Sequence, residues 1–185
     1  MQAQRRRPLC VVLVPDSRRT ALELDLSAVL AEARARFCLQ GPAQYNLCIS
    51  HRKRIQLNRE ANERERRAHP AVLVRAGTNA RAQDMWVWPG LRLLGCAGHR
   101  RIRNGVLYEV EAVGDDSITV GEGRLTFQQA VTSLRLAYAQ TYASCQGTEF
   151  SGSVALWDTT NRHFSMRHLF VAMSRARKAE DICVK

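Results

Sequence analysis

Short apolar segments alternate with longer segments of helical periodicity at both ends of this 185-residue chain. Residues 9–14 and 45–50 are apolar runs of strand length. Residues 24–37 and 51–70 follow them with helical spacing, the second being highly charged and ended by a proline. Strands that alternate with helices predict an α/β fold, with a mostly parallel sheet and helices on its faces.

The last third of the chain repeats this pattern. Residues 153–158 are predicted to form a buried strand, residues 165–178 a helix, and residues 181–185 a final strand.

The middle of the chain, residues 86–127, instead contains short strand-like runs separated by glycine and proline turns. Asn104 and Gly105 suit a type I′ hairpin, in which both turn residues have positive φ. Four residues, Val106, Tyr108, Val110 and Ala112, alternate with Leu107, Glu109 and Glu111, as in a half-exposed strand. This region predicts a small antiparallel β-barrel inserted into the larger unit.

The formal net charge of +11 favours a polyanionic partner, most often nucleic acid. Lysine occurs only at Lys53, Lys178 and Lys185, so nearly all the positive charge comes from arginine. A GC-rich coding sequence gives the same bias, and a single surface arginine therefore carries little information.

The six cysteines form no C-x-x-C pair, and Cys10, Cys48 and Cys183 lie within apolar runs. This predicts buried reduced thiols in an intracellular protein of the nucleus or cytoplasm, without a disulfide framework or metal site. No apolar run approaches the roughly 20 residues of a membrane helix. The apolar run after the basic N-terminus is too short for a signal peptide, so we interpret it as a strand.

Two segments carry the strongest functional signal: AYAQTYASCQGTEF at 137–150 and FVAMSRAR at 170–177. They resemble motifs V and VI of superfamily 1 helicases, in particular the RecD/PIF-like branch, in the same order and at the same spacing. Residues 46–62 are similar to motif IV, and residues 88–113 to the SH3-like module of this branch. The resemblance covers residues 45–185.

The resemblance implies the C-terminal RecA-like domain of such a helicase, with a P-loop-NTPase-type sheet. Residues 1–82 would be its first part, residues 83–130 the SH3-like antiparallel β module, and residues 131–185 its second part with motifs V and VI.

In the first segment, Thr141 and Gly147 suit the start and end of a short helix that follows a strand. Such a helix start can bind a phosphate, although an ordinary capped connection would use the same residues. The resemblance implies that Thr141 and Ser144 grip single-stranded DNA, and that Gln146, Gly147 and Glu149 face the nucleotide. Ala143-Ser144 replaces the usual His-Lys pair of the family, which removes one cation from this grip.

In the second segment, Met166, Leu169, Phe170 and Met173 form an apolar stripe that should face the sheet. A helical projection puts Arg175 opposite this stripe and Arg177 close to it. The resemblance implies that Arg175 is an arginine finger that reaches the nucleotide. A cation that complements the helix C-terminus is the alternative for Arg175.

Arg52, Lys53 and Arg54 follow a strand end, where ligands commonly bind in α/β sheets. They could contact phosphates, or could form the solvated start of a charged helix. Trp86 and Trp88 could stack on bases, or could pack the small barrel.

The chain contains no G-x-x-x-x-G-K-[ST] loop to bind the phosphates of ATP. ATP with Mg²⁺ is therefore expected only at an interface with an N-terminal RecA-like domain, in cis upstream or in trans. We expect half of an ATP-dependent DNA helicase of 5′ to 3′ polarity, inactive alone. The alternatives are a non-enzymatic basic module that binds single-stranded nucleic acid, or a decayed helicase fragment.

Overall fold

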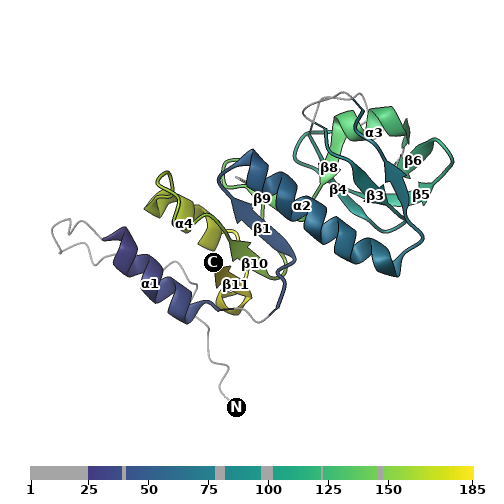
Figure 1. The fold of residues 1–185 in the computed structure, drawn as a ribbon. Helices are drawn as coiled ribbons and strands as arrows, with labels where there is room; N and C mark the ends of the chain where they lie inside the picture. Colours follow the sequence, from purple (N-terminus) through teal and green to yellow (C-terminus); the bar gives the residue numbers. More distant parts are fainter. Residues whose placement is uncertain (1–24, 39–40, 78–81, 97–101, 122, 146–147) are drawn as a thin grey trace, which may run out of the picture. The chain divides into compact units, whose positions relative to one another are not determined.

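A computed structural model describes residues 25–38, 41–77, 82–96, 102–121, 123–145 and 148–185. The chain divides into two compact units. One consists of residues 1–49 and 141–185, and the other of residues 50–140 (Figure 1). The expected strand at 9–14 lies outside the described residues.

The first unit is built on a four-stranded sheet of order β11-β10-β1-β9. β10 (Val154–Leu156) pairs in parallel with both β1 (Tyr45–Cys48) and β11 (Ile182–Val184). The chain returns to this unit within β9 (Ala139–Thr141), and the N–H of Tyr142 donates to the carbonyl of Cys48 at 3.0 Å. All three residues of β10 are buried, as expected for a central parallel strand.

Two helices supply the apolar side chains that cover this sheet. α1 (Leu26–Arg36) begins at Asp25, whose carboxylate accepts the N–H of Ser27, and it packs against β11. α4 (Met166–Met173) buries Leu169 and Ala172 in the same core. The 3₁₀ turn Ala179–Asp181 leads from α4 to β11. The predicted α1, β1, β10 and β11 are therefore all present.

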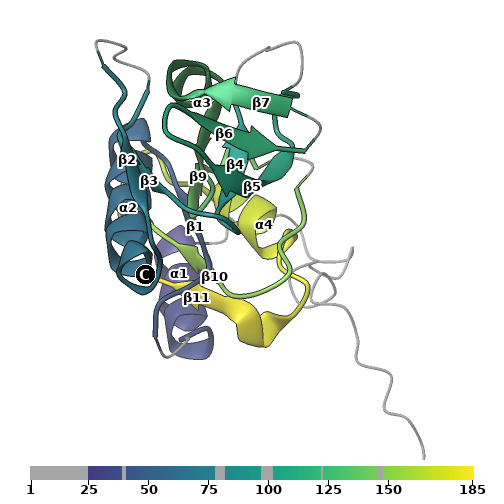
Figure 2. The same cartoon turned by 90° about the vertical axis from the view of Figure 1, so that its right-hand side faces the viewer.

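The second unit is largely antiparallel. Its five-stranded sheet has the order β7-β6-β5-β4-β8, and a separate two-stranded sheet pairs β2 with β3. α3 (Phe127–Ser133) packs against the strands that flank it (Figure 2). The strands are β2 (Val72–Val74), β3 (Met85–Val87), β4 (Arg92–Gly95), β5 (Leu107–Val113), β6 (Ser117–Val120), β7 (Gly123–Thr126) and β8 (Leu134–Leu136).

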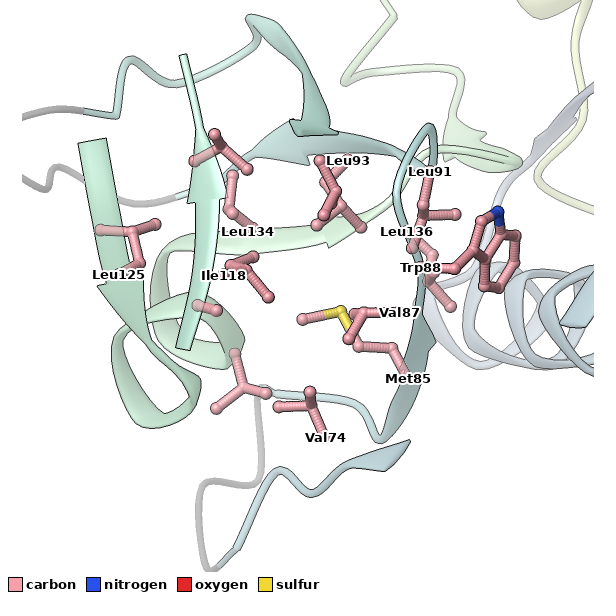
Figure 3. Packing of buried hydrophobic residues seen from close by; sticks show 14 of the residues in the cluster. Val74, Met85, Val87, Trp88, Leu91, Leu93, Ile118, Leu125, Leu134 and Leu136 are labelled. Carbon is pink, nitrogen blue, oxygen red and sulfur yellow. The ribbon is translucent and has the colours of Figure 1, made fainter. Parts of the chain in front are cut away.

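The core of the second unit is an apolar cluster in which side chains from both sheets point toward one another (Figure 3). Met85 and Val87 come from the two-stranded sheet, whereas Leu93, Ile118 and Leu136 come from the five-stranded sheet. All five side chains are at most 2% exposed. A dry core of this kind supports the predicted antiparallel module.

α2 (His51–Glu65), followed by the 3₁₀ turn Arg66–Ala68, is attached to the second unit by two buried asparagines one helical turn apart. The Asn58 amide accepts the N–H of Ala139 at 2.9 Å and donates to its carbonyl at 3.2 Å. Asn62 makes the same pair of bonds to Trp86, at 2.8 and 2.9 Å. Each amide therefore satisfies both backbone polar groups of one residue, which burial would otherwise leave unpaired.

The compact second unit is longer than the module expected at 83–130, because it also contains α2, β2 and the segment 131–140. The two asparagine contacts explain part of this difference, since they fasten the helix that resembles motif IV to strands of the antiparallel unit.

The type I′ hairpin predicted at Asn104-Gly105 is wrong. Gly105 has φ +79°, but the only described non-glycine residue with positive φ is Asp158. The N–H of Val106 donates to the carbonyl of Arg103 at 3.4 Å and closes the turn, while the N–H of Gly105 donates to the carbonyl of Gly95 at 2.9 Å. The predicted alternation in β5 holds as far as Val110, where a bulge between Val110 and Ala112 shifts the register.

Candidate nucleotide and nucleic-acid site

The turn that follows β9 is closed by reciprocal hydrogen bonds between Thr141 and Ser144. The Ser144 N–H donates to Oγ1 of Thr141 at 3.2 Å, and the Thr141 N–H donates to Oγ of Ser144 at 3.1 Å. The two hydroxyl oxygens lie 3.0 Å apart. Residues 142–145 form a hydrogen-bonded turn, not the expected short helix, and Gln146 and Gly147 lie outside the described residues. Thr141 is buried, so Ser144 is the more exposed hydroxyl of the pair.

Tyr142 fixes this turn to the rest of the first unit. Its hydroxyl donates to the carbonyl of Trp157 at 2.8 Å, and its ring lies edge-on to Phe164 and His168 at centroid distances of 5.6 and 5.4 Å. Burial raises the pKa of the Tyr142 hydroxyl. The buried, neutral side chain of Tyr142 thus holds the turn in place, and Ala143 and Ser144 remain exposed at the surface.

The ends of the two helicase-like segments are joined by a short parallel bridge between Phe150 and Ala176. The N–H of Phe150 donates to the carbonyl of Arg175 at 2.9 Å. The Phe150 ring is buried at 2% exposure and contacts Tyr45 at a centroid distance of 4.8 Å. Beside the bridge, Nε of Arg177 lies 3.1 Å from Oε1 of Glu149. Residues 149–150 and 175–177 therefore lie side by side.

Arg175 lies beyond the end of α4, which stops at Met173. The helical projection used for this residue therefore does not apply to it. Its Nε is buried and has no hydrogen-bond partner among the described residues. Burial raises the pKa of the Cys145 thiol, and the nearby positive charge of Arg175 opposes that rise. The guanidinium consequently lies close to the residue that precedes Gln146.

Two expectations about α4 are wrong. Phe170 is 57% exposed, although it was placed in the stripe that faces the sheet. Leu169 and Met173 are buried as expected, and Met166 is partly buried against the core. Arg177 was expected near this stripe, but its side chain is exposed and paired with Glu149.

Arg52 and Lys53 belong to the second unit, at the start of α2. Ser50 caps this helix by accepting the N–H of Lys53 at 3.1 Å. Arg52 is exposed, whereas Arg54 is 8% exposed. Both cations proposed for phosphate contact, Arg52 and Lys53, therefore lie in the first turn of α2, two and three residues after Ser50.

The two tryptophans pack the second unit. Trp88 is 3% exposed and stacks on His69 at 4.9 Å. The indole N–H of Trp86 donates to Glu63 at 2.7 Å, and the Arg66 guanidinium covers its ring at 4.2 Å. These contacts favour packing over base stacking.

Sequence reasoning missed the His168 contact that begins α4. Nδ1 of His168 accepts the N–H of Ser165 at 3.1 Å and lies 2.9 Å from its hydroxyl. The sequence signal for this capping box was Ser165 three residues before His168, whose ring can accept a hydrogen bond. Glu or Gln is the usual residue at the position of His168.

Within the described part of the chain, no helix is long and apolar enough to cross a membrane, and no group of three or more metal-binding side chains is found. The five described cysteines are free thiols, and Cys48, Cys145 and Cys183 are buried. Cys10 lies outside the described residues.

Comparison with protein families gives a match over residues 32–184 to the viral superfamily 1 RNA helicase core domain. The chain belongs to this family. Both helicase-like segments, and the residues that join them, lie within the matched range. Comparison of this chain with curated proteins gives no match.

Solved structures of Pif1 helicases share the fold of this helicase core domain. A Bacteroides Pif1 bound to ssDNA has a TM-score of 0.59 at 17% identity, covering 85% of this chain and 45% of the solved chain. A structure of two Pif1 helicases at forked dsDNA has a TM-score of 0.57 at 18% identity, covering 85% and 42%. A Bacteroides Pif1 complex with ADP-AlF3 and ssDNA has a TM-score of 0.55 at 19% identity, covering 90% and 46%.

This likeness confirms the expected RecA-like fold, and the family match confirms that the chain is a superfamily 1 helicase domain. The chain spans less than half the length of each of these three structures.

Proposed function

We propose that this chain is the C-terminal half of an ATP-dependent DNA helicase of 5′ to 3′ polarity. In this proposal it supplies a grip on single-stranded DNA and an arginine finger to an N-terminal RecA-like domain, in cis or in trans. That domain would hold the phosphates of ATP and Mg²⁺. Residues 83–130 would serve as the SH3-like module between the two parts of the RecA-like domain.

The observation that carries the proposal is the junction of Phe150 with Ala176. It brings Glu149 beside Arg177 and keeps the Arg175 guanidinium near Cys145. A buried guanidinium nitrogen without a partner among the described residues suits a group that completes its contacts on an anion. In a motor, that anion is the γ-phosphate of the nucleotide.

The proposed assignments follow from this arrangement. The nucleotide would contact Gln146, Gly147, Glu149 and Arg175. The single strand would contact Thr141, Ser144, Arg52 and Lys53.

We predict that the Arg175→Ala variant loses ATP hydrolysis when the chain is combined with an N-terminal superfamily 1 motor domain. An arginine finger contributes on the order of 10³-fold or more to the rate of phosphoryl transfer. The measurement is ATPase activity with and without single-stranded DNA, with single-stranded RNA in a parallel series. Arg92→Ala is the matched control, because Arg92 is an exposed arginine paired with Glu109.

The combined protein should hydrolyse ATP faster with DNA, and Arg92→Ala should match the wild type. Equal activity of Arg175→Ala and the wild type would contradict the arginine-finger role. Binding of single-stranded nucleic acid without ATPase activity in any combination would instead support the non-enzymatic binding module.

A further inference from the structure

The loop between β10 and α4, together with the first turn of α4, carries exposed positive charge. Arg162 and Arg167 are exposed, and neither forms an ion pair within the described part of the chain. Nε of Arg162 donates to Nε2 of the exposed His163 at 3.1 Å. Residues 157–168 contain a single acid, Asp158, and Oδ2 of that acid accepts the N–H of Ile49 at 2.9 Å.

This loop has a defined backbone conformation. The carbonyl of Asp158, which has φ +61°, accepts the N–H of Asn161 at 2.9 Å. Oδ1 of Asn161 accepts the N–H of His163, also at 2.9 Å, and the carbonyl of Asn161 accepts the N–H of Phe164 at 2.8 Å. Because the backbone is held at both ends of the loop, the position of Arg162 is restricted, and less entropy is lost when it binds.

Tyr142, two residues before Ser144, connects the turn after β9 to this loop. Its hydroxyl bonds to the residue that begins the loop, Trp157, and its ring contacts Phe164 near the loop's end. The loop also follows the carboxyl end of β10, the sheet edge where ligands bind in open α/β folds. Ser144 itself carries no charge, and Arg162 and Arg167 add exposed positive charge to the segment that Tyr142 connects to this turn.

We propose that Arg162 and Arg167 bind phosphates of the single-stranded nucleic acid next to Ser144. This inference rests on the proposed function, and it adds a second, charged part to the strand-binding surface. The two arginines supply the positive charge that Ser144 lacks in comparison with the lysine usual in this motif. Arginine can contact a phosphate through two parallel N–H groups, which suits a backbone contact without base specificity.

The test is a salt titration of the affinity for a fluorescent oligo(dT), measured by anisotropy, on the complete chain. Each lost phosphate contact should reduce the slope of log K against log salt by about 0.7 for a single strand. Arg162→Ala/Arg167→Ala should therefore reduce the slope by about 1.4, and Arg162→Lys/Arg167→Lys should retain it.

Arg36→Ala/Arg92→Ala is the matched control. It removes two exposed arginines that lie within 4.0 Å of Glu32 and Glu109. A control slope equal to that of the wild type is expected. A wild-type slope in Arg162→Ala/Arg167→Ala would overturn the inference and leave the proposed function intact. A wild-type chain that does not bind oligo(dT) or oligo(U) at low salt would overturn both. Circular dichroism of each variant confirms that its fold is retained.

Discussion

His168 connects the start of α4 with the turn after β9. Its ring contacts Tyr142, and its Nδ1 accepts the N–H of Ser165. Because Nδ1 is the acceptor, the neutral ring carries its proton on Nε2, and protonation would place a second hydrogen on the accepting nitrogen. Burial lowers the pKa of His168 below its ordinary value of 6.5, and the positive charge of Arg167 acts in the same direction.

We predict that His168 makes the protein less stable in mild acid. Since its folded-state pKa is lowered, the unfolded chain takes up a proton first as the pH falls below 6.5. The contribution of neutral His168 to the free energy of unfolding is therefore fully present above that pH and is progressively lost below it. Thermal unfolding between about pH 8 and about pH 5, a range that spans the titration of histidine, measures the effect.

His168→Gln should reduce the pH dependence and keep the helix start, because glutamine is a usual partner in this capping arrangement. The exposed His163→Gln is the control and should retain the wild-type pH dependence. An unchanged pH dependence in His168→Gln would show that other groups cause it.

At the scale of the element, the sequence predicted the buried strands of the first unit, and it also predicted α1 in that unit and α2 in the second unit. α1 and α2 were predictable because apolar spacing and an Asp or Ser cap mark their starts. The end of α4 was not predictable, because the chain leaves the helix at Ser174 to pair Ala176 with the distant Phe150. The Gly105 turn was misassigned because an Asn-Gly pair also suits a turn in which only the glycine has positive φ.

The candidate site divides in the same way. The resemblance to the helicase motifs assigned Glu149 and Arg175 to one site, and the structure brings their backbone segments together. The pairing of Arg177 with Glu149 depends on tertiary contact and could not be derived from helical periodicity.

Adjacent residues of α4 give a direct test of which face of the helix is buried. Leu169 is 0% exposed and Phe170 is 57% exposed. Leu169→Ala should lower the free energy of unfolding by about 2–5 kcal/mol, because it leaves a cavity in the core. Phe170→Ala should change it by about 0.5 kcal/mol or less. Denaturant unfolding of both variants measures the difference, and a larger loss in Phe170→Ala would contradict the assigned burial.

For the whole molecule, the main feature is an insertion: the second unit is one continuous stretch of sequence, residues 50–140, and it separates the two stretches that form the first unit. The chain leaves the first unit after Ile49 and returns at Thr141. Both crossings adjoin neighbouring strands, since the Tyr142 N–H donates to the Cys48 carbonyl. The inserted unit has its own apolar core, as a domain that folds independently needs.

We predict that residues 50–140 fold when expressed alone. The expected result is a cooperative thermal transition followed by circular dichroism, as for an independent domain with its own core. Leu93→Ala in the same piece should lower its free energy of unfolding by about 2–5 kcal/mol, since Leu93 is 0% exposed. A non-cooperative transition in the isolated piece would contradict the prediction.

The pairing of Phe150 with Ala176 also limits how the first unit can move. The backbone at Arg175 cannot shift far while its carbonyl remains bonded to Phe150, whose ring is enclosed by the core. In the proposed motor, a pull on Arg175 by the phosphates of ATP would therefore be passed along the chain toward Ser144. The Phe150–Ala176 pair would then couple the bound nucleotide mechanically to the turn that contacts the single strand.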